Sequence, residues 1–298
     1  MINLIYKTIA KEIPNVVGGK KLYFLKYSTH SASQLPNAKV IIFAFREGVA
    51  VPTLVIKTVR SYERKGTILR NFDNLSMLNE TVAGSPYAEI FPKALFLHDD
   101  GENVFSVETA CPGRRIKLDQ ATFDVVVSQY TDLAQFLARK ENGSLIALEI
   151  LADEMIESSG FNDRDRTEIK KFFLTLAPDN IAVPRLLQHG DITEDNLLLS
   201  EGGLHIMDCD LVGRIHLPGF DLFGLFYRYK PQLIEQVCYK YLPGYFQSIG
   251  AQVGENYHRL FFLYFFTERV IRKVHLLERL SAEQVIADYK KIFSDSKL

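Results

Sequence analysis

The segment from His189 to Asp210 constrains this chain of 298 residues more than any other. It opens with the pattern H-G-D-x4-N, which presents Asp191 and then Asn196, and it closes with I-x-D-x-D, whose first acid is Asp208. Between Asn196 and Asp208 lie an apolar run, a Gly-Gly turn and a second apolar run. This order predicts a short β-hairpin with an amide before it and a carboxylate after it.

The residue types in this segment suit phosphoryl transfer from a nucleotide. A carboxylate such as Asp191 can accept the proton of an incoming hydroxyl, and the oxygens of Asn196 and Asp208 can hold Mg²⁺ against the phosphates. Positioning and charge neutralisation do most of the work in this reaction, so a few acceptors in the right order are enough. Each acid alone would more often be a helix cap or a solvated loop residue. The ordered set favours the catalytic interpretation.

The segment resembles the catalytic segment of the aminoglycoside phosphotransferase and choline kinase family, small-molecule relatives of the protein kinases. The resemblance implies that Asp191 is the catalytic base and that Asn196 and Asp208 are the metal ligands. It also implies that His189 orders the loop by hydrogen bonding without taking part in the chemistry. Asp210 stands where the family often has a second acid.

Further along, the run Leu217 to Leu222 resembles the short P-x-x-D-L element of this family. In that element the acid, here Asp221, helps to hold the active-site loop from the start of a helix.

The first hundred or so residues predict strands and one helix. Lys57 ends the third predicted strand, where the kinase fold places its phosphate-contacting lysine. An ordinary lysine at a strand end is the alternative interpretation. The predicted strands are Lys21–Tyr27, Val40–Phe45, Thr53–Lys57, Glu89–Leu97 and Val104–Glu108, with a helix at about Thr67–Val82.

Two features depart from the family pattern. The predicted helix carries Asn71 where the family has a glutamate that pairs with the lysine, so Asp73, Glu63 or another group has to serve Lys57 instead. The loop at residues 28–37 contains no glycine, whereas protein kinases have a glycine-rich loop there. If no anion reaches Lys57, its positioning is weaker.

A Pro-Gly segment follows the strand that ends at Glu108. It resembles the strand–E-x-x-P-G hinge of the family, where backbone groups grip the nucleotide base, which implies nucleotide binding by Glu108 and Ala110. Because backbone atoms do this work, the side chains of the segment say little about ATP versus GTP. We therefore expect a nucleotide-binding lobe at residues 1–110 and a catalytic and acceptor-binding lobe at residues 111–298.

From Leu118 onward the periodicity is helical. Asp119 predicts a helix start, Asp163 to Leu176 predicts a further helix, and the chain from Asp221 is expected to be almost all helix, with a capping box at Ser281. The predicted architecture is α+β: a two-lobed protein-kinase-like fold with an N-terminal antiparallel sheet plus one helix and a larger, mostly helical C-terminal lobe.

Composition excludes several other classes of protein. The formal net charge of −1 gives no case for a nucleic-acid or membrane partner, and 47% apolar with 24% charged residues is typical of a globular protein. The three cysteines are far apart and favour a reducing, cytoplasmic setting over a disulfide framework or a zinc site. Charge appears too early at the N-terminus for a signal peptide, and the most apolar run is too short to span a membrane.

These observations predict a phosphotransferase that moves the γ-phosphoryl of ATP or GTP, with Mg²⁺, to a hydroxyl of a small molecule: a sugar, an amino alcohol or an aminoglycoside-like acceptor. The aromatic residues between Phe220 and Tyr229 could line the acceptor site, but core packing is the more common role. A non-catalytic nucleotide-binding scaffold is the main alternative. A protein kinase fits less well because Gly190 replaces the usual arginine.

Overall fold

The computed structural model of the protein describes residues 1–27, 39–141, 144–177, 181–229, 234–271 and 280–294. The chain forms two compact units, one of residues 1–116 with 194–211 and one of residues 117–193 with 212–298. The segment at residues 194–211, which contains the predicted hairpin, belongs to the first compact unit, although it lies beyond the predicted lobe boundary after residue 110. The assignment of nucleotide binding to residues 1–110 and of catalysis and acceptor binding to residues 111–298 stays a prediction.

The first unit is built on a five-stranded antiparallel sheet in the order β1-β2-β3-β5-β4. All the strands predicted for this region are present; β4 starts at Ala94 instead of Glu89, and the other strands start within one residue of the predicted position. The strands are β1 (Leu22–Tyr27), β2 (Val40–Arg46), β3 (Leu54–Thr58), β4 (Ala94–Asp99) and β5 (Val104–Thr109).

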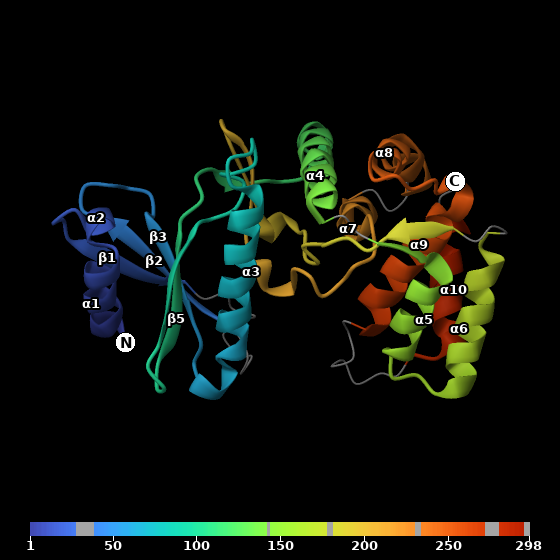
Figure 1. The fold of residues 1–298 in the computed structure, drawn as a ribbon, viewed down its shortest axis with the longest axis horizontal. Helices are drawn as coiled ribbons and strands as arrows, with labels where there is room; N and C mark the ends of the chain where they lie inside the picture. Colours follow the sequence, from blue (N-terminus) through green and yellow to red (C-terminus); the bar gives the residue numbers. More distant parts are fainter. Residues whose placement is uncertain (28–38, 142–143, 178–180, 230–233, 272–279, 295–298) are drawn as a thin grey trace. The chain divides into compact units, whose positions relative to one another are not determined.

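Two helices that the sequence did not predict, α1 (Ile2–Glu12) and α2 (Pro14–Val17), pack on one face of this sheet. Ile5 and Ile9 are one helical turn apart and fully buried, in one core with Ile56 and other strand residues. The predicted helix, α3 (Gly66–Val82), lies on the opposite side of the sheet from α1 (Figure 1). One face of the sheet therefore packs against α1 and α2 in an apolar core, and the other face lies toward α3.

The predicted β-hairpin after Asn196 is confirmed. Strands β9 (Leu197–Ser200) and β10 (Gly203–Ile206) are antiparallel, and β6 (Arg114–Arg115) adds a third strand beside β9. Gly113 precedes β6 with a φ of 108°, and a Cβ there would lie 2.6 Å from the carbonyl oxygen of Leu199. Only glycine permits this approach, which fastens the Pro-Gly segment to the hairpin.

The second unit is mostly helical. Asp119 accepts a bond from the backbone N–H of Thr122, and Ser281 accepts one from Gln284, as the capping signals predicted. Helix α5 and the two-stranded sheet β7–β8 were not predicted. The elements are α4 (Gln120–Glu141), β7 (Leu145–Ala147), α5 (Leu148–Glu157), α6 (Asp163–Thr175), β8 (Ala182–Pro184), α7 (Phe220–Tyr229), α8 (Ile234–Ser248), α9 (Tyr257–Phe266), a π-helix (Thr267–Ile271) and α10 (Ala282–Ser294).

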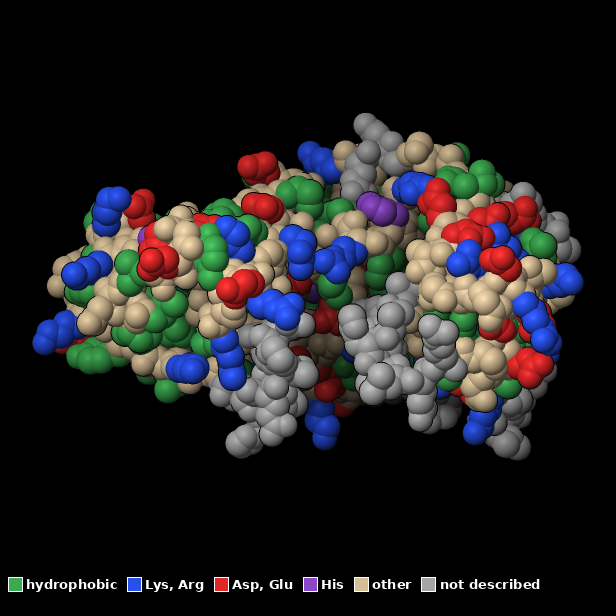
Figure 2. All heavy atoms as spheres, turned by 90° about the horizontal axis from the view of Figure 1, so that it is seen from below, with side chains coloured by type: hydrophobic (Ala, Val, Ile, Leu, Met, Phe, Trp, Pro, Cys, Tyr) green, Lys and Arg blue, Asp and Glu red, His purple; other side chains and the backbone are tan. Residues whose placement is uncertain are grey.

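Aromatic rings fill the core of this unit. Phe220, Phe223 and Phe226 of α7 are buried, and Phe223 meets Phe261 of α9 with ring centroids 5.6 Å apart. The aromatic residues between Phe220 and Tyr229 therefore belong mainly to the core, which was their expected role. Within the described ranges no helix is long and apolar enough to cross a membrane. Figure 2 shows basic and acidic side chains scattered together over the visible face.

Candidate active site

Lys57 has a carboxylate partner, and it comes from the sheet. Its ammonium lies 3.0 Å from a carboxylate oxygen of Glu108 on β5 and 3.1 Å from the side-chain oxygen of Asn71 on α3. Lys57 is 5% exposed and Glu108 is 4% exposed. The two candidates from the sequence lie elsewhere, because Glu63 bonds the hydroxyl of Ser61 and Asp73 is exposed.

The charges around Lys57 keep its ammonium ionised. Burial alone would lower the pKa of Lys57, but the negative charges of Glu108 and Asp208 outweigh burial and raise the pKa above its ordinary value. Burial raises the pKa of Glu108, and the ammonium of Lys57 opposes that shift. A buried cation with a fixed partner is what a phosphate-contacting lysine requires.

Asn71 connects Lys57 to the predicted metal ligand. Its amide oxygen accepts from Lys57, while its amide nitrogen lies 3.4 Å from a carboxylate oxygen of Asp208. One helical turn later, Asn74 donates to the backbone carbonyl of Cys209 at 2.8 Å. Helix α3 is thus joined to the segment Asp208–Leu211 by two neutral amides.

The predicted metal ligands lie at the open end of the hairpin. The backbone N–H of Met207 donates to the carbonyl of Asn196 at 2.8 Å, which brings Asn196 beside the start of the Asp208 segment. Asp208 has a φ of 62°, an unusual conformation for a residue other than glycine and one found often at functional sites.

Lys39, just before β2, contacts both acids of this segment. Its ammonium touches Asp208 and lies 2.7 Å from Asp210. No sequence pattern pointed to Lys39, because it is 169 positions away from Asp208 in the chain. The position between Asp208 and Asp210 therefore holds a cation in this structure.

The donor set fits Mg²⁺. The other carboxylate oxygen of Asp210 is buried and has no hydrogen-bond partner among the described residues, so it can accept a cation contact. Carboxylate and amide oxygens from Asn196, Asp208 and Asp210 are hard donors, and Mg²⁺ usually keeps several waters and phosphate oxygens as further ligands. In the described part of the chain, no cluster of three or more His, Cys, Asp or Glu forms a metal cage of its own.

In the second unit, the loop that carries Asp191 is fastened to the start of α7. The carboxylate of Asp221 accepts the backbone N–H groups of His189 at 2.7 Å and Gly190 at 2.8 Å. The ring of His189 in turn accepts the N–H of Asp191 at 3.3 Å. Gly190 has a φ of 81°, which favours glycine at the centre of H-G-D. These are the holding contacts that the resemblance implied for Asp221 and His189.

Tyr130 of α4 completes this arrangement. Its hydroxyl donates to the same carboxylate of Asp221, and both side chains are buried. Burial raises the pKa of Asp221, whereas its electrostatic interaction with His189, the Tyr130 hydroxyl and the two amides oppose that shift. Three donors thus converge on one buried acid.

A small depression of about 10 Å³ adjoins Asp191. Arg228 of α7 and Glu268 of the π-helix line it and lie 3.4 Å apart, with Tyr264 beside them. A π-helix turn occurs often at functional sites, because it turns side chains out of the regular helical register. The depression therefore offers one donor cation and one acceptor anion near Asp191.

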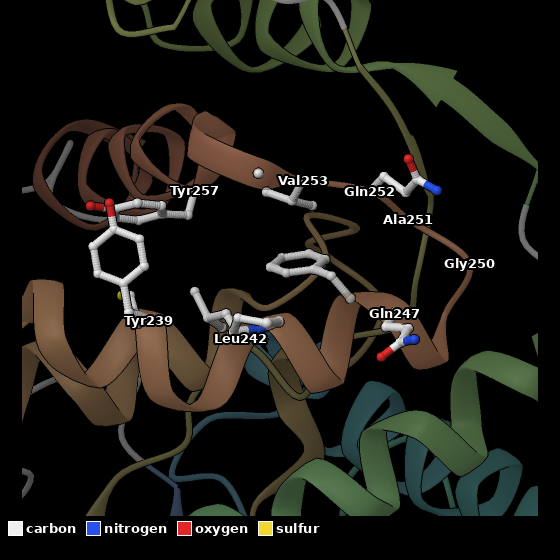
Figure 3. A pocket seen from close by; sticks show the side chains of 12 residues that line it. Tyr239, Leu242, Gln247, Gly250, Ala251, Gln252, Val253 and Tyr257 are labelled. Atoms are coloured by element: carbon white, nitrogen blue, oxygen red, sulfur yellow. The ribbon is translucent and has the colours of Figure 1, made fainter.

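A larger pocket of about 530 Å³ lies elsewhere in the second unit (Figure 3). It is mostly apolar, and the rings of Tyr239 and Tyr257 meet at one end with centroids 4.9 Å apart. None of the predicted site residues lines it. The lining comes from Cys238, Tyr239, Leu242, Pro243, Phe246, Gln247, Gly250, Ala251, Gln252, Val253, Gly254 and Tyr257.

The two predicted hinge residues are engaged within the sheet. The side chain of Glu108 is turned to Lys57, and the backbone N–H of Ala110 donates to the carbonyl of Thr53 at 3.1 Å. Three residues separate Glu108 from Pro112, one more than in E-x-x-P-G. Because side chains alternate along a strand, one added residue turns the glutamate to the other face. Contact of Glu108 or Ala110 with a nucleotide stays a prediction.

Comparison with solved structures places this architecture among known folds. A thermostable mutant of aminoglycoside phosphotransferase APH(4)-Ia, in a ternary complex with ADP and hygromycin B, is 10% identical with a TM-score of 0.59, over 97% of this chain and 98% of that one. A GDP complex of an aminoglycoside 2'-phosphotransferase-IIIa mutant is 14% identical with a TM-score of 0.49, over 99% and 97%. A putative fructosamine-3-kinase from Haemophilus somnus 129PT is 12% identical with a TM-score of 0.47, over 97% and 99%.

No protein-family model and no curated protein matches the sequence. The structural likeness nevertheless extends over nearly the whole of both chains, and the five-stranded sheet with a mostly helical second part matches the predicted architecture. The chain has the protein-kinase-like fold of the aminoglycoside phosphotransferases.

Proposed function

We propose that this protein is a phosphotransferase that moves the γ-phosphoryl of ATP or GTP to a hydroxyl of a small molecule. The observation that carries the proposal is the buried network of the first unit, in which Lys57 is joined through Asn71 to Asp208. A phosphate-contacting cation and a metal-binding acid are the two groups that nucleotide phosphoryl transfer needs for binding and neutralising the phosphates.

The remaining part is a group that accepts a proton. In the proposed step Asp191 takes the proton of the acceptor hydroxyl, whose oxygen forms a bond to the γ-phosphorus. The bond from the γ-phosphorus to the oxygen that bridges it to the β-phosphate breaks, and the nucleoside diphosphate leaves with that electron pair. Lys57 contacts the phosphates, and Mg²⁺ held by Asn196 and Asp208 would supply further charge neutralisation.

The groups near Asp191 bear on the acceptor. Arg228 and Glu268 pair with each other, and Asp191 and Asp221 also line the depression, so its ionisable side chains offer donors and acceptors with a formal net charge of −2. Such a lining suits an acceptor with several hydroxyl or amino groups, and its charge does not favour a neutral sugar over a cationic acceptor. The solved APH(4)-Ia complex contains hygromycin B, and it supports a small-molecule acceptor as the general class.

A non-catalytic nucleotide-binding scaffold remains the alternative class. Asn71 at the usual glutamate position motivated it, because a lysine without an anionic partner would be poorly placed. Glu108 supplies that partner. This contact, together with the presence of Asp191, Asn196 and Asp208 in the sequence, supports the catalytic proposal over the scaffold.

The test is transfer of label from γ-labelled ATP and GTP, with Mg²⁺, to pooled sugars, amino alcohols, aminoglycosides and nucleosides. We expect one pool to be labelled and the label to disappear in Asp191→Asn. Asp163→Asn, which makes the same substitution at a fully exposed residue, is the matched control and is expected to keep full transfer. Magnesium-dependent nucleotide binding without transfer to any pool would support the scaffold instead.

A further inference from the structure

We propose that Glu108 is the positioning residue of Lys57, in place of a helix glutamate, and that Asn71 couples this pair to Asp208. The inference rests on the proposed function, because it assigns roles to residues that support the phosphate-contacting lysine. It gives Glu108 a different role from the nucleotide-base contact that the hinge resemblance implied.

The geometry of the sheet fixes the pair. In the antiparallel ladder of β3 and β5, Lys57 is opposite Ser106 and Val55 is opposite Glu108. Residues two apart on a strand point to the same face, so Lys57 and Glu108 are diagonal neighbours on one face of paired strands. Backbone hydrogen bonds between these strands hold both Cα positions, and the 3.0 Å contact requires no movement of α3.

The chemistry of position 71 is consistent with a relocated charge. An amide has both a donor and an acceptor, and Asn71 uses its oxygen for Lys57 and its nitrogen for Asp208. A glutamate at this position would have only acceptors and would place a second negative charge beside Asp208. The neutral amide thus bridges a cation and an anion without repelling either.

The burial of Glu108 argues against a direct role in gripping the base. Its side chain is 6% exposed, and its carboxylate is already bonded to an ammonium that is equally buried. Desolvated ion pairs of this kind are strongly destabilised when one partner is removed. The carboxylate of Glu108 is therefore occupied by its ion pair with Lys57, and this pair holds Lys57 in place before any nucleotide binds. We expect no activation step that depends on a shift of α3.

The first experiment compares Glu108→Gln with Glu108→Gln/Asn71→Asp, in the full-length protein with MgATP and MgGTP. Glu108→Gln keeps the shape but removes the charge, and we expect kcat to fall by about 10²-fold, the usual effect of misplacing a catalytic group by an ångström. The fall should be equal for ATP and GTP. In the double variant a carboxylate returns to within reach of Lys57 from position 71, and we expect recovery of about tenfold or more.

Asn71→Asp alone is the matched control. Next to an intact Glu108 it only adds charge beside Asp208, so we expect it to lower kcat, and its benefit should appear only when Glu108 is neutral. A change in the ratio of KM for ATP to KM for GTP in Glu108→Gln would overturn the proposal in favour of base contact. Loss in the double variant equal to the product of the two single losses would overturn it as well.

A companion measurement separates this inference from the proposed function. Calorimetric binding of MgATP reports on Lys57 whether or not phosphoryl transfer occurs. If the wild type binds MgATP but transfers nothing, the proposed function fails, while weaker binding in Glu108→Gln that recovers in the double variant still supports the positioning role. Unchanged MgATP affinity and unchanged kcat in a folded Glu108→Gln variant would refute it. Lys57→Met/Glu108→Gln, which leaves no unpaired charge, checks that folding alone is not being measured.

Discussion

Replacing Asp221 with asparagine should disconnect the Asp191 loop from helix α7. The carboxylate accepts three donors: the backbone N–H of His189 at 2.7 Å, that of Gly190 at 2.8 Å, and the hydroxyl of Tyr130. The two amides use different oxygens of the carboxylate. Asparagine keeps one of these oxygens and replaces the other with an NH₂ group, which would face a donor.

The magnitude follows from the burial of this cluster. Asp221 is 2% exposed, so the amide that loses its acceptor and the new NH₂ group both remain away from water. Each buried unsatisfied group costs about 1–3 kcal/mol, so we expect Asp221→Asn to lower the free energy of unfolding by about 2–6 kcal/mol. Tyr130→Phe removes a single donor and leaves both amides bonded. Its expected cost is about 1.5–3 kcal/mol, the usual range for a hydrogen bond to a charged group.

Urea denaturation and steady-state kinetics test this expectation together. In Asp221→Asn, kcat should fall by about 10²-fold because the loop that carries Asp191 is no longer held in position, while KM for the nucleotide stays nearly constant. Tyr130→Phe should keep most of kcat. If Asp221→Asn is no less stable than Tyr130→Phe, or if it keeps wild-type kcat, the two amide bonds do not position the loop.

Three further predictions concern other parts of the site. Lys39→Ala should strengthen the binding of Mn²⁺ in the absence of nucleotide by about five- to tenfold, measured by electron paramagnetic resonance. The substitution removes an ammonium that competes with the metal for Asp208, an interaction worth about 1 kcal/mol. Weaker binding would contradict this. Arg228→Ala should raise KM for the acceptor and leave KM for the nucleotide unchanged, and a reversed pattern would exclude the depression as the acceptor site. Burial, with a smaller contribution from the charge of Glu108, raises the pKa of the Cys111 thiol to about 12. Alkylation of native protein at pH 8, followed by mass spectrometry, should therefore be about 10³-fold slower than in urea and rise tenfold per pH unit from 7 to 9, whereas a fast, pH-independent rate would refute the burial.

Local patterns made much of the architecture predictable. The hairpin from Leu197 to Ile206 follows from two apolar runs around a Gly-Gly turn, and the cap at Asp119 needs only the residues next to it. The contacts of Asp221 with the H-G-D loop were expected from the resemblance, because the acid of the P-x-x-D-L element helps to hold the active-site loop in that family. Each of these predictions depends on residues close together in the sequence or on a motif of fixed spacing.

The partners of Lys57 and Asp208 could not be found in the same way. Glu108 meets Lys57 only because β3 pairs with β5 in one particular register, and Lys39 meets Asp208 although the two residues are far apart in the sequence. A register is decided by the packing of the whole sheet, and a shift of one residue would turn Glu108 away. Helix α1 was missed for a related reason, since Ile5 and Ile9 acquire meaning only when the sheet face that they cover is known.

Asn71 shows why a missing motif residue need not mean a missing function. The lysine requires a nearby negative charge held in a fixed position, and the electrostatic interaction is indifferent to whether a helix or a strand supplies that charge. A strand neighbour has an advantage in rigidity, because backbone bonds of the same sheet hold both residues. With the charge supplied by Glu108, a glutamate at position 71 would serve no purpose and would crowd Asp208, so the neutral amide there completes the network.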